Sequence, residues 1–195
     1  LPQLWRHGMT HAELVTQFEE LQEACFAAIK QEFQSLPEFK GKVTSVCYCT
    51  PYVFEDLELL HTKRHFNADV SYMKIRPEGT IPLGLCLYID YLPVAFAIGD
   101  ISLERKAFEI HLTETSNFFG NSGLVSWIQP MVEILCALKV IIEENTEHKI
   151  EKVAIVNPVE LTIEPLKTIG FEYTREYHKA DQASVLHIKD SDRRI

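Results

Sequence analysis

The chain carries four strand-like segments in succession between residues 69 and 115, joined by very short turns. Connections this short join antiparallel neighbours, because a parallel pair needs a crossover of about a dozen residues or more. Turn residues mark the joints: a Pro-Glu-Gly run at 77–79, Leu92-Pro93, and a charged run at 104–106. The sequence therefore predicts a mostly antiparallel sheet, with strands at 69–76, 83–91, 94–103 and 107–115.

Helices and further strands surround this run. Apolar residues recur at spacings of three and four from Leu14 to Phe33, which indicates an amphipathic helix, and Thr10 with Glu13 forms a capping-box signal at its start. Gly170 is the expected stop of the last helix. The other predicted helices span 53–65, about 124–144 and 158–168, and the other predicted strands span 43–50, 152–156, 173–177 and 184–188. This order predicts an α/β fold of the layered α+β kind.

The charge balance limits the classes of partner. The 195 residues carry 19 Lys+Arg against 28 Asp+Glu, a net charge of -9, whereas nucleic-acid binding needs clustered basic charge. Asp90 and Pro93 interrupt the longest apolar stretch, so we expect no membrane span, and no secretory signal is visible. The 5 cysteines lie in apolar patterns, which favours reduced, buried thiols in a cytoplasmic protein.

Three motifs follow one another from residue 83 onward. The first is LGLCLYIDYLPVAFA at 83–97. The second is the strand at 107–115 with the glycine-bearing loop and long helix after it, and the third is VAIVN at 153–157, followed by LKTIGF at 166–171. In this order they resemble the GNAT superfamily of N-acyltransferases, which use acyl-coenzyme A, over more than half of the chain. The resemblance implies a mixed, mostly antiparallel twisted sheet flanked by helices in residues 41–195. Residues 1–40 would form an extra N-terminal helical extension that covers the substrate side or makes a homodimer contact.

The resemblance also implies an activity. It is the transfer of an acyl group, with acetyl the first candidate, from acetyl-CoA or another acyl-CoA to an amine on a small molecule or peptide. Backbone N–H groups at a helix N-terminus favour phosphate, so the coenzyme pyrophosphate is expected at the glycine-bearing loop. The pantetheine arm is expected along the end of strand 107–115. The implied coenzyme-binding positions are Leu112, Thr113, Glu114, Phe119, Gly120, Asn121, Ser122, Gly123, Leu124 and Asn157.

The strand at 107–115 also carries the candidate catalytic groups. Alternation puts Glu109, His111 and Thr113 on one face and the apolar residues, Leu112 among them, on the other. Under the resemblance, Glu109 is the first candidate for the general base that takes a proton from the acceptor ammonium, and His111 is the second. The alternative is that both belong to the solvated face of a half-buried sheet.

Two positions depart from the family pattern. Asn117 stands where the family carries a basic residue or Gln, which removes a charge-assisted contact to phosphate. Leu166 stands where many members carry the Tyr that protonates the leaving thiolate, and Tyr52, Tyr173 and Tyr177 are conceivable substitutes. These departures leave two alternatives open: transfer from an acyl-carrier-protein donor, or a non-catalytic GNAT-like binding or regulatory module.

Other patterns carry less weight. Arg6-His7-Gly8 imitates the signature of histidine phosphatases, but it has no buried strand before it and no second His-Gly. Two pairs of histidines are candidate metal ligands. His61 and His65 would lie four residues apart on a helix, and His7 and His11 are also four apart in the sequence. Neither pair has the further ligands that a zinc site needs. We therefore predict no metal site, no nucleic-acid partner and no membrane partner.

Overall fold

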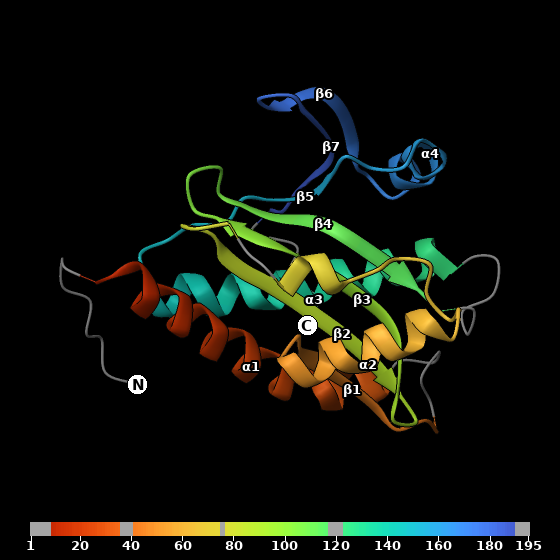
Figure 1. Ribbon diagram of the computed structural model, residues 1–195. Helices are drawn as coiled ribbons and strands as arrows, with labels where there is room; N and C mark the ends of the chain where they lie inside the picture. Colours follow the sequence, from red (N-terminus) through yellow and green to blue (C-terminus); the bar gives the residue numbers. More distant parts are fainter. Residues whose placement is uncertain (1–8, 36–40, 75–76, 117–122, 190–195) are drawn as a thin grey trace.

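The computed structural model describes residues 9–35, 41–74, 77–116 and 123–189, with the side chains of 31–35 and 123–125 excepted (Figure 1). The described fold is built on one 7-stranded sheet in the order β1-β2-β3-β4-β5-β7-β6. The strands are β1 (Thr44–Tyr48), β2 (Ile81–Ile89), β3 (Leu92–Ser102), β4 (Ala107–Thr115), β5 (Lys152–Val156), β6 (Glu172–His178) and β7 (Asp181–His187). The helices are α1 (His11–Ser35), α2 (Pro51–Thr62), the 3-10 helix η2 (Ser71–Lys74), α3 (Gly123–Asn145) and α4 (Glu160–Thr168).

The sheet is mixed and mostly antiparallel, as the sequence predicts. β1 to β4 are antiparallel in order, and β2, β3 and β4 follow one another through tight turns. β4 and β5 are parallel, because α3 carries the chain back along the sheet between them. β7 pairs with β5 and β6 pairs with β7, both antiparallel. The strands predicted at 107–115 and 152–156 are found at those residues.

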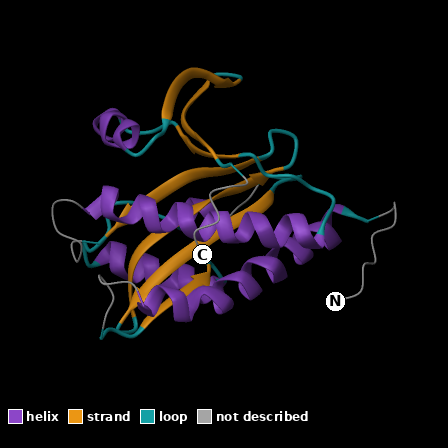
Figure 2. Ribbon diagram, turned by 180° about the vertical axis from the view of Figure 1, so that it is seen from behind, coloured by secondary structure: helices purple, strands orange, loops and turns teal. Residues whose placement is uncertain are grey.

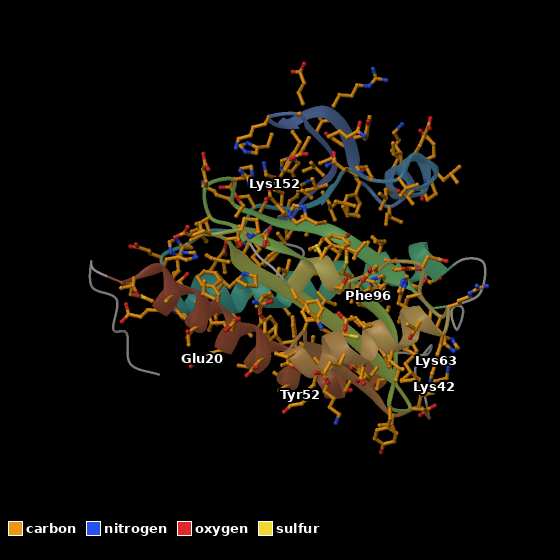
Figure 3. All side chains as sticks on the ribbon, viewed as in Figure 1. Glu20, Lys42, Tyr52, Lys63, Phe96 and Lys152 are labelled. Carbon is orange, nitrogen blue, oxygen red and sulfur yellow. The ribbon has the colours of Figure 1, made fainter. Side chains whose placement is uncertain are left out.

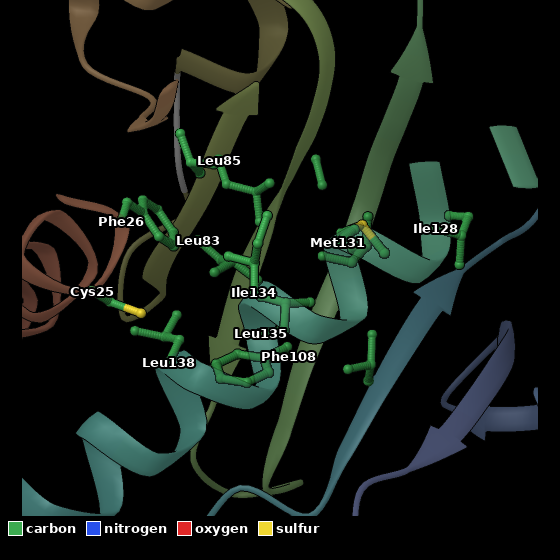
Figure 4. Close-up of a cluster of buried hydrophobic side chains, with 14 of the residues drawn as sticks. Cys25, Phe26, Leu83, Leu85, Phe108, Ile128, Met131, Ile134, Leu135 and Leu138 are labelled. Carbon is green, nitrogen blue, oxygen red and sulfur yellow. The ribbon is translucent and has the colours of Figure 1, made fainter. Parts of the chain in front are cut away.

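Helices cover both faces of the sheet. α1 and α3 pack together on one face, while α2 and η2 lie on the other; Figure 1 shows α2 in front of the strands and α3 behind them, and Figure 2 gives the opposite view. The first face buries the larger apolar cluster, which contains Phe26 of α1, Leu83 of β2 and Leu138 of α3 (Figure 4). The second face buries a smaller cluster that includes Phe66 and Phe96. Within the described residues, no helix combines the length and the apolar character that crossing a bilayer requires.

Polar contacts join α1 to the sheet. The predicted capping box is confirmed: the Thr10 N–H donates to Glu13 Oε2 (2.7 Å) and the Glu13 N–H to Thr10 Oγ1 (3.3 Å). Gln22 is fully buried, and its amide donates to the Pro82 carbonyl (2.9 Å) and accepts from the Gly84 N–H (3.2 Å). α1 is therefore built into the core. The division into an extension at 1–40 and a domain at 41–195 stays a prediction.

The prediction of a strand at 69–76 is wrong, because Ser71–Lys74 forms the 3-10 helix η2. The Ser71 N–H donates to Asp69 Oδ1 (2.9 Å), and the Met73 N–H donates to the Val70 carbonyl (2.9 Å). Val70 and Met73 are both buried. The two buried residues are thus three apart, which is the repeat of a 3-10 helix, whereas the residues on one face of a strand are two apart.

The 5 cysteines are all reduced thiols. Cys25, Cys49 and Cys86 are buried, as the apolar patterns predict, while Cys47 and Cys136 are half-buried. The thiols therefore contribute to the fold as small apolar side chains.

Candidate functional site

β4 and β5 pair over only part of the length of β4. The ladder joins residues 107–110 of β4 to residues 152–155 of β5. β4 continues to Thr115, and in the described structure its residues 111–115 have no partner on β5. On its other side β4 stays paired with β3 as far as Thr115. One edge of the second half of β4 is therefore open, and Figure 1 shows β5 turning away from it.

Alternate residues offer their backbone groups to this open edge. The Ser116 N–H donates to the Val94 carbonyl (2.8 Å) on β3. In an antiparallel ladder, Glu114 and Leu112 then also direct their N–H and C=O groups toward β3. Thr113 lies between them and directs its groups to the open side. Of the three positions predicted for the pantetheine arm, Thr113 is thus the one whose main chain faces the open edge.

A β-bulge at His111 marks the point where the strands separate. Ile98 of β3 lies opposite Leu112. The next residue of β3, Gly99, lies opposite Ile110, which leaves His111 as an extra residue in β4. A bulge bends its strand and increases the local twist. The second half of β4 is turned away from β5 for this reason.

The bulge also changes the face that each residue occupies. Phe108 and Ile110 belong to the cluster under α1 and α3, but Leu112 packs against the second cluster, beside α2. Thr113 lies on the α3 side, where its Oγ1 accepts a hydrogen bond from Trp127 Nε1 (3.0 Å). The expected uninterrupted alternation is therefore wrong beyond Ile110.

Glu109 is 4% exposed, and its carboxylate accepts three hydrogen bonds. Arg105 donates through Nε to Oε1 (2.6 Å) and through Nη2 to Oε2 (2.8 Å), and the Tyr177 hydroxyl donates to Oε1 (2.8 Å). The hydrogen bonds to Glu109 raise the pKa of Arg105 further above its ordinary value. Burial, with the bond to Glu109, raises the pKa of Tyr177, so this hydroxyl keeps its proton at neutral pH. We call Arg105, Glu109 and Tyr177 the Glu109 cluster.

Tyr177 reaches Glu109 because the sheet curls. β6 lies three places from β4 in the strand order, about 14 Å in a flat sheet, which is more than a tyrosine side chain spans. The β6–β7 ladder is irregular between Thr174 and His178, and Figure 1 shows β6 arching over the end of the sheet. Tyr177 packs there against Ala154 and Ala183. These small side chains leave room for its ring.

His111 and Asp100 form a second polar pair beside this cluster. His111 Nε2 lies 3.1 Å from Asp100 Oδ2, and the His111 side chain is exposed. Asp100 is the cross-strand neighbour of Glu109, so the pair adjoins the Glu109 cluster. With Nε2–H directed at the carboxylate, Nδ1 keeps its lone pair. An imidazole held in this way can accept a proton from a bound group.

Two of the predicted coenzyme-binding side chains are engaged elsewhere. The Glu114 carboxylate accepts from the N–H and Nδ2 of Asn67 (both 2.7 Å) and from the N–H of Ala68 (2.8 Å). It therefore fastens the segment after α2 to β4. Asn157 Nδ2 donates to Asp181 Oδ1 (2.9 Å), and its Oδ1 accepts from the main chain of β7. Both side chains hold the fold around the open edge.

The predicted pyrophosphate loop lies mostly outside the described residues, as does the Arg-His-Gly sequence at 6–8. The positions concerned are Asn117, Phe119, Gly120, Asn121 and Ser122. Gly123 is the first residue of α3, and Leu124 follows it in the first turn. The assignment of this loop to a pyrophosphate stays a prediction.

Of the three tyrosines considered as proton donors, Tyr177 is the one that contacts Glu109. Tyr52, on α2, is 79% exposed. Lys152 marks the position of Tyr177, because its Nζ lies 5.4 Å from the centre of the Tyr177 ring. Figure 3 shows Tyr52 far from Lys152. The Tyr173 hydroxyl is bonded within the β6–β7 hairpin. Leu166 is buried in the first apolar cluster, so its role is packing.

Sequence reasoning misses Arg105 and Asp100. Arg105 lies in the turn between β3 and β4, where its spacing of four from Glu109 is the one available signal. Asp100 has no signal in the sequence, because its partner His111 is fixed by the register of β3 against a bulged β4.

The described residues contain no group of three or more His, Cys, Asp or Glu side chains arranged to hold a metal ion. α2 ends at Thr62, so His61 and His65 do not share a helix face. His7, the sequence neighbour of His11 in the other pair, lies outside the described residues.

No protein-family model matches the sequence, and no curated protein matches it. Solved structures resemble the fold. The ribosomal-protein-S18-alanine N-acetyltransferase of Escherichia coli aligns with a TM-score of 0.50 and 11% identity, over 78% of this chain and 98% of its own. An acetyltransferase from Thermus thermophilus aligns with a TM-score of 0.50 and 10% identity, over 74% of this chain and 97% of its own. The fold is that of the GNAT acetyltransferases, in agreement with the resemblance in the sequence.

Proposed function

We propose that the protein is an N-acyltransferase of the GNAT type, which moves an acyl group, acetyl in the first instance, from a coenzyme A thioester to an amine. The observation that carries the proposal is the open edge of β4 beyond Ile110, beside the exposed imidazole of His111. An extended chain with amide groups can bind to such an edge as an added strand would. The likeness of fold to two acetyltransferases supports it.

The main chain of Thr113 is the proposed contact for the amides of the pantetheine arm. Its side chain is fixed from two sides: Oγ1 donates to the Phe96 carbonyl (2.7 Å) and accepts from Trp127. The strand is therefore held at the point where it would bind, which lowers the entropy cost of binding. When bound, the coenzyme supplies an activated acyl carbon for attack by the amine.

His111 is the proposed general base, and Asp100 is its positioning residue. The family resemblance ranks Glu109 first, but three donors fill most of the roughly four acceptor positions of its carboxylate. His111 is exposed, adjoins the open edge, and has one ring nitrogen directed at Asp100. Nδ1 of His111 is then available to take the proton of the acceptor ammonium.

Two observations favour the alternative of a non-catalytic binding module. Glu109, the acid that the family resemblance would make the base, is locked in an ion pair with Arg105. Leu166 is buried where many members of the family carry the acidic Tyr. A protein that keeps the edge of β4 but not the chemistry would bind an acyl-coenzyme A without turning it over.

Calorimetric titration with acetyl-CoA, followed by an assay of thiol release with a panel of peptides and small amines, separates these functions. Binding with amine-dependent thiol release supports acyl transfer. Binding without release for any acceptor supports the binding module. The absence of binding at millimolar acetyl-CoA contradicts both and leaves a carrier-protein donor as the alternative.

A matched pair of variants tests the proposed contact at Thr113. Thr113→Pro removes the N–H on the open side, where proline is tolerated because that group serves no ladder. We expect it to weaken acetyl-CoA binding by about tenfold, the worth of one hydrogen bond. Thr113→Val keeps the N–H but loses the hydroxyl that Trp127 contacts. Equal losses of affinity in the two variants would contradict the edge contact.

A further inference from the structure

Three thiols gather at the first edge of the sheet, away from the proposed acyl-transfer site. Cys47 lies in β1, Cys49 directly after it, and Cys86 in β2. All three belong to the apolar cluster on the α2 side, with Cys47 at its partly exposed margin. The proposed acyl transfer uses none of them.

Cys47 and Cys86 are directly opposite each other in the antiparallel ladder. The Asp90 N–H donates to the Val43 carbonyl and the Cys49 N–H to the Gly84 carbonyl, so alternate pairs along this ladder, including this one, are hydrogen-bonded pairs. The two Cα atoms of such a pair lie about 5.5 Å apart. That is the commonest separation across a disulfide.

The other pairings of these thiols fit a disulfide less well. Cys49 is diagonal to Cys86, because its own cross-strand neighbour is Gly84, and diagonal neighbours lie about 7–8 Å apart. Cys47 and Cys49 are two residues apart along one extended chain, with Cα atoms about 6.6 Å apart and side chains that point the same way. A disulfide needs its Cβ atoms within about 4.5 Å of each other, and the Cβ atoms of directly opposite residues such as Cys47 and Cys86, about 4.5–5.5 Å apart, have the shortest distance to move.

Access distinguishes the two opposed cysteines. A pocket of about 350 Å³ lies between α1, β1 and the start of α2, and Cys47 is among its lining residues, with Phe26 and Val53. Cys86 is fully buried. A small oxidant therefore reaches the Cys47 sulfur first.

We propose that Cys47 and Cys86 form a peroxide-sensitive thiol pair that closes reversibly into a cross-strand disulfide. The Cys47 thiolate attacks one oxygen of hydrogen peroxide, the O–O bond breaks, and Cys47 sulfenic acid and hydroxide are formed; the hydroxide takes up the proton that the Cys47 thiol lost and becomes the first water. The Cys86 sulfur then attacks the sulfenic sulfur, the S–O bond breaks, and a second water leaves with the thiol proton. Two thiols are oxidised and one peroxide is reduced. A dithiol reductant reverses the change.

Burial raises the pKa of the Cys86 thiol well above its ordinary value, and the neighbouring thiols of Cys49 and Cys47 add to the effect. Only the thiolate attacks efficiently, so the second step is the slow one at neutral pH. We expect this step to accelerate by up to about tenfold per pH unit as the pH rises from neutrality. The Cys47 sulfenic acid should therefore accumulate at neutral pH.

The test uses the full chain, folded and untagged. Hydrogen peroxide is added at neutral and at alkaline pH, sulfenic acid is trapped with dimedone, the remaining thiols are alkylated, and the peptides are mapped by mass spectrometry. We expect a dimedone adduct on Cys47 at neutral pH. Without dimedone, we expect a Cys47–Cys86 disulfide that forms faster at alkaline pH and disappears with dithiothreitol.

Variants locate the chemistry. Cys49→Ser should keep the disulfide, while Cys47→Ser should abolish both the adduct and the disulfide. Cys136→Ser, on α3, is the matched control for the loss of a half-buried thiol and should change nothing. The proposal would be overturned by a disulfide that joins Cys49 to Cys47 or to Cys86. It would also be overturned if, at alkaline pH, Cys47 were oxidised to sulfinic acid while Cys86 stayed reduced. The mapping of the wild-type chain distinguishes these outcomes even if a variant fails to fold.

Discussion

The Tyr177 hydroxyl donates a hydrogen bond to Glu109 Oε1 at 2.8 Å, although the strands that carry the two residues stand three places apart in the sheet. This bond ties the curled β6–β7 hairpin to β4 just before the strand opens. With the short ladder between β4 and β5, it holds the C-terminal strands against the rest of the sheet. The geometry of the open edge therefore depends on a contact well outside it.

Tyr177→Phe tests that dependence. The variant keeps the ring against Ala154 and Ala183 but leaves Glu109 with one donor fewer. We expect a loss of about 1–2 kcal/mol in the free energy of unfolding, the usual cost of a part-buried hydrogen bond to a charged group. Urea unfolding followed by circular dichroism measures it. Tyr173→Phe, which loses a bond within the hairpin only, is the control: hydrogen exchange in β4 should be faster in Tyr177→Phe and unchanged in Tyr173→Phe.

The raised pKa of Tyr177 leads us to expect that the stability of the fold depends on pH. The pKa of Tyr177 is raised in the folded chain by burial and by the bond to Glu109, whereas the unfolded value is about 10. The folded state therefore binds the proton more tightly. The stabilisation is fully present below about pH 10 and is lost as the pH rises from there toward the folded pKa. Above pH 10, the stability of Tyr177→Phe should fall less steeply than that of the wild type. A slope unchanged from the wild type would refute this.

Substitution of His111 tests the proposed base. We expect His111→Gln to lower kcat/KM for acyl transfer by about a hundredfold or more while acetyl-CoA still binds. Asp100→Asn should lower kcat by a smaller factor and leave the KM for acetyl-CoA unchanged, because it changes the partner that orients the imidazole rather than removing the base. His65→Gln, an exposed histidine beyond α2, should match the wild type. If His111→Gln also matches it, His111 is not the base.

Gly99→Ala tests the packing at the bulge. A Cβ on Gly99 would lie 1.7 Å from the carbonyl oxygen of Glu109, so β3 or β4 has to move. We expect a loss of about 3 kcal/mol or more, with weaker protection of the β4 amides in hydrogen exchange. Gly79→Ala is the control without a clash, because a Cβ there meets nothing within 4 Å. It should lose only about 1 kcal/mol, the cost of placing an alanine at a φ of +85. Equal losses would show that the clash relaxes.

Local patterns predict much of this fold. The strand at 107–115, the capping box at Thr10 and the helix stop at Gly170, which adopts a φ of +97, depend on residues close in sequence, and all three are found where expected. The segment at 69–76 misleads, because its β-forming residues favour a strand although its two buried apolar residues lie three apart, as in a 3-10 turn.

The site depends on relationships that a local pattern does not contain. The bulge at His111 exists only as a mismatch between β3 and β4, and it reverses the face of every later residue in the strand. The bond from Tyr177 to Glu109 joins residues 68 apart in the chain. The sequence could therefore place Glu109 and His111 on one strand, but it could not show that Glu109 is occupied while His111 is exposed.

The burial of α1 has a consequence for any shortened form of this protein. Phe18, Cys25 and Phe26 lie against the sheet and α3, and the Gln22 side chain completes the hydrogen bonding of Pro82 and Gly84. A chain that began after residue 40 would expose to water the apolar surface of the sheet and α3 that α1 covers, together with two main-chain groups left without hydrogen-bond partners. Such a fragment should aggregate on expression, so a shortened form of the chain has to keep the first helix.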